Sequence, residues 1–304
     1  HFTYGEINNT RIYCGVIIDN TYLYMGTDNG ILIYNYRTDR YEQPATDFPT
    51  DVRTMALQGD TLWIGALNGL YTYQLQNRKL SPLGTKRNGL PHNTIYSIIR
   101  TGDNQIYVGT YNGLCRYIAS NGKFEKIPLP VNSSQSNLFV NSLLEDTGRQ
   151  CIWIGTEGYL FQYFPSTGQM KQTEAFHNNS IKSLALDGNG YLLAGTDNGL
   201  YVYHNDVTPL QHIIHDSRNI QSLTNNIIWN IFADQEHNIW LGTDYGISLS
   251  RYNSALQFIP ISQITGTGDG NQFYSLFRDS KGFYWFGGTN GLIRFTDPAG
   301  DKHN

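Results

Sequence analysis

The stretch WLGTDYGISLS, which begins at Trp240, has the form that decides the fold: two apolar residues, a glycine, a short turn with a second glycine, and an apolar strand. Phrases of this form also begin at Tyr24, Trp63, Tyr107, Trp153, Leu193 and Trp285. Their first glycines are 39, 44, 46, 40, 47 and 45 residues apart, at Gly26, Gly65, Gly109, Gly155, Gly195, Gly242 and Gly287. A period of roughly 40–45 residues with strand-like content is typical of a β-propeller. The sequence therefore predicts one all-β domain over residues 1–304, a seven-bladed β-propeller centred on these glycines.

The third repeat shows why each blade is expected to be a four-stranded antiparallel sheet. Strand-like runs cover residues 94–100, 105–110, 113–119 and 123–129, with turn-rich segments between them. Asn-Gly pairs separate the second and third strands of five repeats, and both residues of such a hairpin turn tolerate positive φ. The fourth repeat has Glu157-Gly158-Tyr159 and the sixth has Tyr245-Gly246, so a different turn shape is expected in these two. Turn aspartates before the second strands are expected to accept backbone hydrogen bonds, as at Asp187, Asp234 and Asp279.

Two further features concern how the blades assemble. A glycine inside a strand weakens a sheet, so its return in all seven repeats indicates that neighbouring blades approach closely there. The last repeat has no obvious fourth strand after residues 291–296, and HFTYGEI, residues 1–7, resembles the missing one. We therefore predict that the N-terminal strand closes the last blade, which removes open sheet edges.

Composition excludes several classes of function. The net charge of −4 gives no basic surface for nucleic acid, and no apolar run approaches the roughly 20 residues that cross a bilayer. No signal peptide opens the chain, and a chain beginning at His1 is expected to be part of a longer protein. Cys14, Cys115 and Cys151 lie in different repeats and are expected to be buried free thiols. The eight scattered histidines and the lack of nucleophile or phosphate-loop motifs predict no metal, no cofactor and no catalytic residue.

A candidate ligand site emerges when the innermost strands are aligned on the repeat glycines. One column contains only small residues, which suit a crowded axis: Cys14, Thr54, Ser97, Ser142, Ser183, Asn230 and Ser275. The column just before it is aromatic, basic or amide: Tyr13, Arg53, Tyr96, Asn141, Lys182, Trp229 and Tyr274. Aromatic rings stack on the apolar faces of sugars, and the cations and the amide donate hydrogen bonds, so a ring of these residues suits a sugar-like ligand. Alternatively, the same side chains pack between blades or line a water-filled shaft.

The turns between second and third strands should lie on the same face as this column. They add the residues Asp28, Tyr111, Glu157, Asp197, Asp244 and Tyr245. Glu157, Asp197 and Asp244 fall on three successive blades, which leaves glycoside hydrolysis as an alternative. Solvated acidic residues in turns are the simpler interpretation. The predicted ligand-binding residues are Tyr13, Arg53, Tyr96, Tyr111, Lys182, Asp197, Trp229, Asp244, Tyr245 and Tyr274.

Two stretches carry a resemblance to a known family. Residues 215–247, HDSRNIQSLTNNIIWNIFADQEHNIWLGTDYGI, and residues 274–295, YSLFRDSKGFYWFGGTNGLIRF, resemble the two-component regulator propeller repeat. The resemblance implies the periplasmic sensor region of a Bacteroidetes hybrid two-component system, in which two propellers and an immunoglobulin-like domain precede a membrane helix, a histidine kinase, a receiver and a DNA-binding domain. It also implies recognition of oligosaccharides and activation of polysaccharide-utilisation genes by phosphorelay. The chain contains no kinase sequence, so no phosphoacceptor histidine is assigned.

The leading hypothesis is therefore a non-enzymatic sensor that binds an oligosaccharide and contacts a second propeller, an Ig-like domain or a second copy of itself. A glycan-cleaving propeller enzyme and a protein–protein scaffold are the alternatives. The sequence does not distinguish which glycan is bound.

Overall fold

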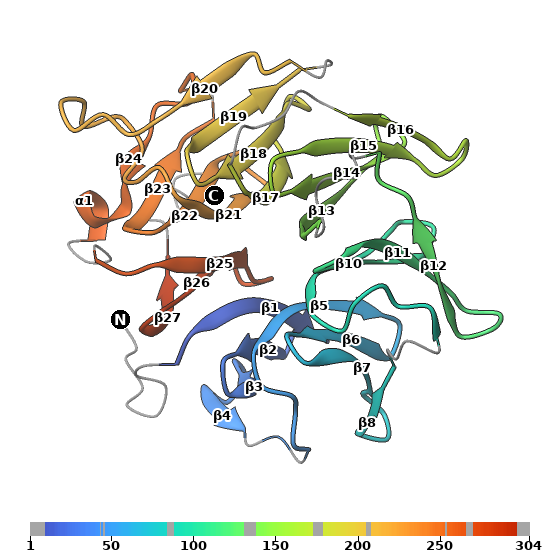
Figure 1. Ribbon diagram of the computed structural model, residues 1–304. Helices are drawn as coiled ribbons and strands as arrows, with labels where there is room; N and C mark the ends of the chain where they lie inside the picture. The colour runs from blue at the N-terminus through green and yellow to red at the C-terminus, as the bar shows by residue number, and fades with distance from the viewer. Residues whose placement is uncertain are drawn as a thin grey trace.

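The computed structural model describes residues 10–42, 44, 46–83, 88–130, 138–172, 179–204, 208–252, 254–265 and 270–296. They form seven antiparallel sheets arranged around a common axis, as Figure 1 shows. Blade 1 contains β1 (Ile12–Ile18), β2 (Tyr22–Thr27), β3 (Gly30–Asn35) and β4 (Arg40–Glu42), and blade 2 contains β5 (Val52–Gln58), β6 (Thr61–Ala66), β7 (Gly69–Gln74) and β8 (Lys79–Pro82). Blade 3 contains β9 (Ile95–Arg100), β10 (Ile106–Thr110), β11 (Gly113–Ile118) and β12 (Lys123–Ile127). Blade 4 contains β13 (Val140–Asp146), β14 (Cys151–Thr156), β15 (Leu160–Phe164) and β16 (Gln169–Gln172).

The remaining three blades continue the same order. Blade 5 contains β17 (Ile181–Leu186), β18 (Leu192–Thr196), β19 (Gly199–Tyr203) and β20 (Gln211–Ile213). Blade 6 contains β21 (Ile228–Ala233), β22 (Ile239–Thr243), β23 (Gly246–Ser250) and β24 (Ile259–Pro260). Blade 7 contains β25 (Phe273–Arg278), β26 (Tyr284–Gly288) and β27 (Gly291–Phe295). A short helix, α1 (Ile261–Thr265), lies in the connection between blades 6 and 7. The prediction of a seven-bladed propeller is confirmed. The predicted closing strand falls on residues 1–7, outside the described residues, so it stays a prediction.

Close packing between blades explains the glycine that recurs inside the second strand. At each of the seven positions, an added Cβ would lie under 3.0 Å from an atom of the next blade's inner strand. The residues that occupy this space are fully buried: Ile12, Val52, Ile95, Val140, Ile181, Ile228 and Phe273. Ile12 of blade 1 packs in this way on Gly287 of blade 7, so the same contact also closes the ring. The predicted packing role of the glycines is confirmed.

The hairpin turns form as predicted, but one residue earlier in register. In blade 1, Thr27 pairs with Gly30, and only the glycine has positive φ, at 115°. The turn residues are therefore Asp28 and Asn29, followed by a left-handed glycine, and the expectation of positive φ at the asparagine is wrong. Thr27 Oγ1 stabilises this turn because it accepts from Asn29 N and donates to Gly30 O, both at 3.0 Å.

The two variant turns have different outcomes. In blade 6, Thr243 pairs with Gly246, which has a φ of 93°, so this turn has the common shape and the expectation of a difference is wrong. In blade 4, the positive φ of 84° falls on Gly158, and Thr156 Oγ1 donates to Tyr159 O at 2.9 Å. The fourth turn therefore differs as expected.

The turn aspartates at the opposite face have the structural role expected of them. Asp279 Oδ1 accepts from the backbone N–H groups of Lys281 and Phe283, and its Oδ2 accepts from Trp285 Nε1 at 2.8 Å. Asp234 Oδ2 accepts from Trp240 Nε1 in the same way, and also from the Tyr284 hydroxyl of the next blade at 2.7 Å. Both carboxylates fix the start of the second strand, and Asp234 also links blades 6 and 7. Among the described residues, no helix is long and apolar enough to cross a membrane.

Candidate ligand-binding site

A β-bulge in each inner strand creates the site. In blade 1, Ile12 pairs with Thr27 and Cys14 pairs with Gly26, so Tyr13 is the extra residue between two consecutive pairs. The same register shift occurs in the other six blades, at Arg53, Tyr96, Asn141, Lys182, Trp229 and Tyr274. A bulge changes the direction of a side chain and is common beside functional sites. The variable column of the sequence is therefore the set of seven bulged residues.

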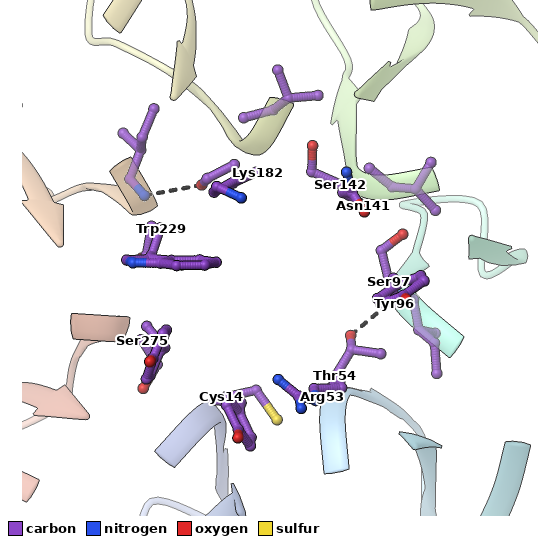
Figure 2. A pocket seen from close by; sticks show the side chains of 18 of the residues that line it. Cys14, Arg53, Thr54, Tyr96, Ser97, Asn141, Ser142, Lys182, Trp229 and Ser275 are labelled. Carbon is purple, nitrogen blue, oxygen red and sulfur yellow. Dashed lines mark hydrogen bonds between the residues drawn. The ribbon is translucent and has the colours of Figure 1, made fainter. Parts of the chain in front are cut away.

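These seven residues surround the mouth of the central channel. A cavity of about 720 Å³ is lined by all seven bulged residues and by all seven small residues that follow them. Figure 2 shows side chains of both kinds around this opening, with one bulged and one small residue from the same inner strand in the pairs Arg53 and Thr54, Tyr96 and Ser97, and Asn141 and Ser142. The small residues also connect blades, since Thr54 Oγ1 accepts from Ile98 N at 3.1 Å and Ser183 Oγ accepts from Ile231 N at 2.9 Å.

Three aromatic rings form a continuous arc over blades 6, 7 and 1. The centroid of the Tyr274 ring is 5.4 Å from that of Tyr13 and 5.2 Å from that of Trp229. A cation closes each end of this aromatic arc. Arg53 lies over Tyr13, with Cζ 3.8 Å from the ring centroid, and Lys182 Nζ lies 4.3 Å from the centroid of Trp229. The arc therefore presents apolar ring faces between two positively charged groups.

Acidic partners hold both cations. Lys182 Nζ is 2.9 Å from Asp197 Oδ1, and the second oxygen of Asp197 accepts from Ser180 N at 3.2 Å. Arg53 Nη2 is 3.3 Å from Asp51 Oδ1. The cations are thus fixed in position by carboxylates on their own blades.

Gln272 links two rings of the aromatic arc through their polar ends. Trp229 Nε1 donates to Asp244 Oδ1 at 3.0 Å, and Gln272 Nε2 donates to the same oxygen at 2.6 Å. The Tyr274 hydroxyl donates to Gln272 Oε1 at 2.5 Å. Because each ring is anchored at its polar atom, the orientation of its apolar face is set before any ligand arrives.

The opposite side of the mouth is less aromatic. Tyr96 lies beside Phe139, with ring centroids 5.9 Å apart. The Phe139 ring in turn packs on Tyr111, with ring centroids 4.2 Å apart. Asn141 Nδ2 donates to Ser180 Oγ at 2.9 Å. Burial raises the pKa of the Tyr96 phenol, so this hydroxyl stays protonated and able to donate at neutral pH.

The structure brings most of the predicted site residues together. Six of the ten line the cavity: Tyr13, Arg53, Tyr96, Lys182, Trp229 and Tyr274. Asp197, Asp244 and Tyr111 do not line it but contact residues that do. Tyr245 lies outside the lining and is 54% exposed. The turns contribute support for the site rather than its surface, with the exception of Glu157, which lines the cavity.

Several lining residues were missed from the sequence, among them Arg11, Phe139 and Ser180. Each of these three lies two positions before a bulged residue, so the period of two along a strand was the signal that could have identified them. Arg11 adds a third cation at the mouth. A hydrogen bond to Tyr13 raises the pKa of its guanidinium, with a further contribution from the nearby Tyr274 and Asp28.

Two of the carboxylates considered for glycoside hydrolysis already have partners at the mouth. Asp197 and Asp244 are both committed to donors of the mouth, and the described residues contain no group of three or more side chains that could hold a metal ion. Cys14 lines the channel and is only partly buried, so the prediction of a buried free thiol is confirmed for Cys115 and Cys151 but is wrong for Cys14. Desolvation by its surroundings raises the pKa of the Cys14 thiol to about 12. This thiol is therefore a weak nucleophile at neutral pH.

The fold and its mouth define a propeller with a ring-shaped candidate binding site, and comparisons with known proteins show what this propeller is similar to. A model of the two-component regulator propeller matches residues 89–112, 222–245 and 267–290. The chain is 29% identical over 307 residues to histidine kinase P4 of Formosa agariphila, an alignment that covers 90% of the chain and 21% of that protein.

Solved structures agree with this match. The chain is 92% identical to the extracellular domain of a B. thetaiotaomicron protein described as a hybrid two-component system, with a TM-score of 0.81, and it covers 41% of that domain. A second such domain from B. thetaiotaomicron is 17% identical with a TM-score of 0.73, which shows the shared fold alone. Three segments of the chain thus match the two-component regulator propeller repeat. It spans about two fifths of the extracellular domain that it matches and about one fifth of the curated kinase.

Proposed function

We propose that this propeller is the periplasmic ligand-sensing part of a hybrid two-component regulator, and that its channel mouth binds an oligosaccharide. The aromatic arc of Tyr13, Tyr274 and Trp229, flanked by Arg53 and Lys182, carries the proposal. Sugar rings present apolar C–H faces that stack on such rings, while their hydroxyl groups accept hydrogen bonds from cationic side chains. The similarity to extracellular domains of two-component systems supports a sensory role.

Signalling would proceed through a change in how this propeller docks on neighbouring domains. A closed ring held by seven buried inter-blade contacts has little freedom to rearrange internally. A ligand shifts a conformational equilibrium only through its different affinities for the two states. A ligand that spans the mouth and an adjoining domain would meet this requirement, and the linked kinase would then activate genes for polysaccharide use.

Titration calorimetry with a panel of oligosaccharides tests the proposal on the wild-type protein and on Trp229→Ala and Arg53→Ala. Removal of a central aromatic contact is expected to weaken binding roughly 30-fold, as for other buried aromatic contacts. Tyr252→Ala is the matched control, because Tyr252 is an aromatic residue that is 44% exposed and does not line the cavity. If Trp229→Ala and Arg53→Ala bind as tightly as the wild-type protein and the Tyr252→Ala control, the mouth is excluded as the binding site.

The same samples address the two alternatives. Product formation from the oligosaccharides, abolished in Asp244→Asn, would favour a glycan-cleaving enzyme. Absence of any saccharide binding, together with capture of another protein domain by the mouth, would favour a scaffold.

A further inference from the structure

The outer edge of blade 5 differs from the other described outer edges. The outermost strand of a blade leaves backbone N–H and C=O groups unpaired, and charged residues or proline normally protect such an edge from pairing with another strand. Five of the six described outer strands carry this protection: Arg40 and Glu42 on β4, Lys79 and Pro82 on β8, Lys123, Glu125 and Lys126 on β12, Lys171 on β16, and Pro260 on β24. The strand β20, with the sequence Gln211-His212-Ile213, carries neither.

Exposed aliphatic side chains lie next to this unprotected strand. Leu210 is 60% exposed and Ile214 is 49% exposed, and they flank β20 on either side. Ile220 in the following connection is 76% exposed. These three are the only aliphatic residues among the strongly exposed large hydrophobic residues of the described chain, and all three fall between residues 210 and 220. Figure 1 shows β20 on the outer side of its blade, at the rim of the disc.

The connection that carries Ile220 is held in a fixed shape by its own hydrogen bonds. Ser222 Oγ accepts from Asp216 N at 3.0 Å and donates to Asp216 O at 2.9 Å. Phe258 N in blade 6 donates to Gln221 O at 3.0 Å. Ile220 is therefore held in an exposed position by a well-connected loop.

The residues of β20 are also accessible to solvent, since Gln211 and His212 are both exposed. The His212 ring stacks on Tyr201 of β19, with centroids 4.0 Å apart and an interplanar angle of 11°. Its Nε2 contacts Asn198 O at 2.6 Å. The His212 side chain is thus held over its own sheet.

We propose that β20 pairs with β20 of a second copy of this chain, so that two propellers join rim to rim through one continuous sheet. An antiparallel pair related by a two-fold axis through His212 places Leu210 opposite Ile214 of the second copy, and the reverse. The exposed aliphatic residues lie at equal distances from His212, so the edge is complementary to itself. No Lys, Arg, Asp or Glu of β20 is brought opposite its own copy. This inference is independent of ligand binding at the mouth.

The contact is expected to be weak in solution. A strand of three residues with flanking aliphatic groups buries less than the roughly 1,200 Å² of a stable interface. A pair of chains held on one membrane would have an effective concentration of about 1 mM, which makes a weak contact sufficient. The dimer should therefore be sought up to that concentration.

A cysteine cross-link tests the geometry. In the His212→Cys variant, mild oxidation is expected to produce a disulfide-linked dimer, because each residue 212 faces its own copy. Lys171→Cys is the matched control, since Lys171 is an exposed residue of the outer strand β16. Cys115 and Cys151 are buried, and Cys14, which is partly buried in the channel, is replaced by serine in both variants to remove its background. Equal dimer yields in the two variants would overturn the proposal.

Sedimentation velocity provides a second test that needs no cross-link. Ile214→Lys is expected to weaken self-association at least tenfold without lowering the melting temperature, whereas Tyr252→Lys, at an exposed aromatic residue elsewhere, is expected to leave association unchanged. A protein that stays monomeric up to about 1 mM, or a dimer insensitive to Ile214→Lys, would refute pairing through β20. Slow thiol labelling of His212→Cys in a monomeric, longer extracellular region would also refute it, because a different segment would then cover the edge.

Discussion

The inner strands contain two kinds of position that differ in how they tolerate change. At the first kind, every blade places a large apolar residue, such as Ile181, in the space left by the glycine of the preceding blade, such as Gly155. At the second kind, the next residue along the strand is bulged into the mouth and varies among tyrosine, tryptophan, arginine, lysine and asparagine. Adjacent residues of one strand thus serve blade packing and ligand contact separately.

The bulge is what makes this separation possible. In a regular strand, successive side chains alternate between the two faces of the sheet, and both faces of a blade pack against neighbouring blades. The extra residue has no partner in the ladder, so its side chain can vary without disturbing the packing between blades. Seven different side chains can therefore be displayed on seven nearly identical supports.

The strongest test of this comparison is a change at the repeated position. Gly195→Ala in blade 5 is expected to lower the free energy of unfolding by about 3 kcal/mol, at the upper end for overpacked cores. The added Cβ would lie 2.6 Å from Ile228 Cγ2 and 3.1 Å from its Cβ, and the second of these atoms cannot move away without a shift of the backbone. Urea denaturation followed by tryptophan fluorescence measures the effect.

Gly102→Ala is the control for the loss of a glycine as such. A Cβ at this position would meet only Glu145 oxygens at 3.7 and 3.8 Å, which is ordinary contact. Its effect is expected to stay within about 0.5 kcal/mol. Similar losses of stability in both variants would show that the inter-blade space at Gly195 is not specially constrained.

A change at the variable position of the same blade should have a smaller effect on stability. Lys182→Met removes the ion pair with Asp197 and the contact with the Trp229 ring but keeps an aliphatic stem. The Lys182 and Asp197 side chains are 18% and 39% exposed, so solvent screens the pair, and a loss below about 1 kcal/mol is expected. The same denaturation experiment measures it. A loss as large as that of Gly195→Ala would mean that the bulged residues hold the blades together.

Much of the fold could be predicted because it depends on repetition. The glycine in Trp-Leu-Gly-Thr at Trp240 and its six counterparts fixed the number of blades, and their recurrence inside strands indicated close packing before any contact was known. The turn register was harder to predict. The Thr27 hydroxyl and the left-handed Gly30 place the turn at Asp28 and Asn29, whereas the pattern Asn-Gly alone suggested the following pair.

The candidate site was predictable where it follows the repeat and not where it depends on individual contacts. Alignment on the glycines identified all seven bulged residues, since each occupies the same place in its blade. Gln272 was not identified, because its role depends on a chain of hydrogen bonds to Asp244 and Tyr274 that no spacing reveals. Tyr245 was included on its position in a turn, although turns of this face differ in how far they extend over the mouth.

The small column that follows the bulged position should tolerate exchange among its members. Cys14→Ser gives blade 1 the residue that blades 3, 4, 5 and 7 already have, and the change in unfolding free energy at pH 7 is expected to stay within about 1 kcal/mol. Ser97 Oγ donates to Val140 O at 3.0 Å, and Cys14 Sγ makes the corresponding, longer contact with Val52 O at 4.0 Å. A serine hydroxyl at position 14 would therefore have an acceptor within reach.

The difference in unfolding free energy between wild type and Cys14→Ser should change at alkaline pH, because only the wild type carries the desolvated thiol at position 14. Burial raises the pKa of Cys14 to about 12, so between about pH 9 and pH 12 the thiol ionises in the unfolded chain while it stays protonated in the folded one. The stabilisation that this group provides is complete below pH 9 and is lost with rising pH, at up to about 1.4 kcal/mol per pH unit. Serine does not ionise in this range, so the variant is expected to gain relative stability in urea titrations between pH 7 and about pH 10. A difference that stays constant across this range would show that the channel wall solvates the thiolate and that the small column is open to water.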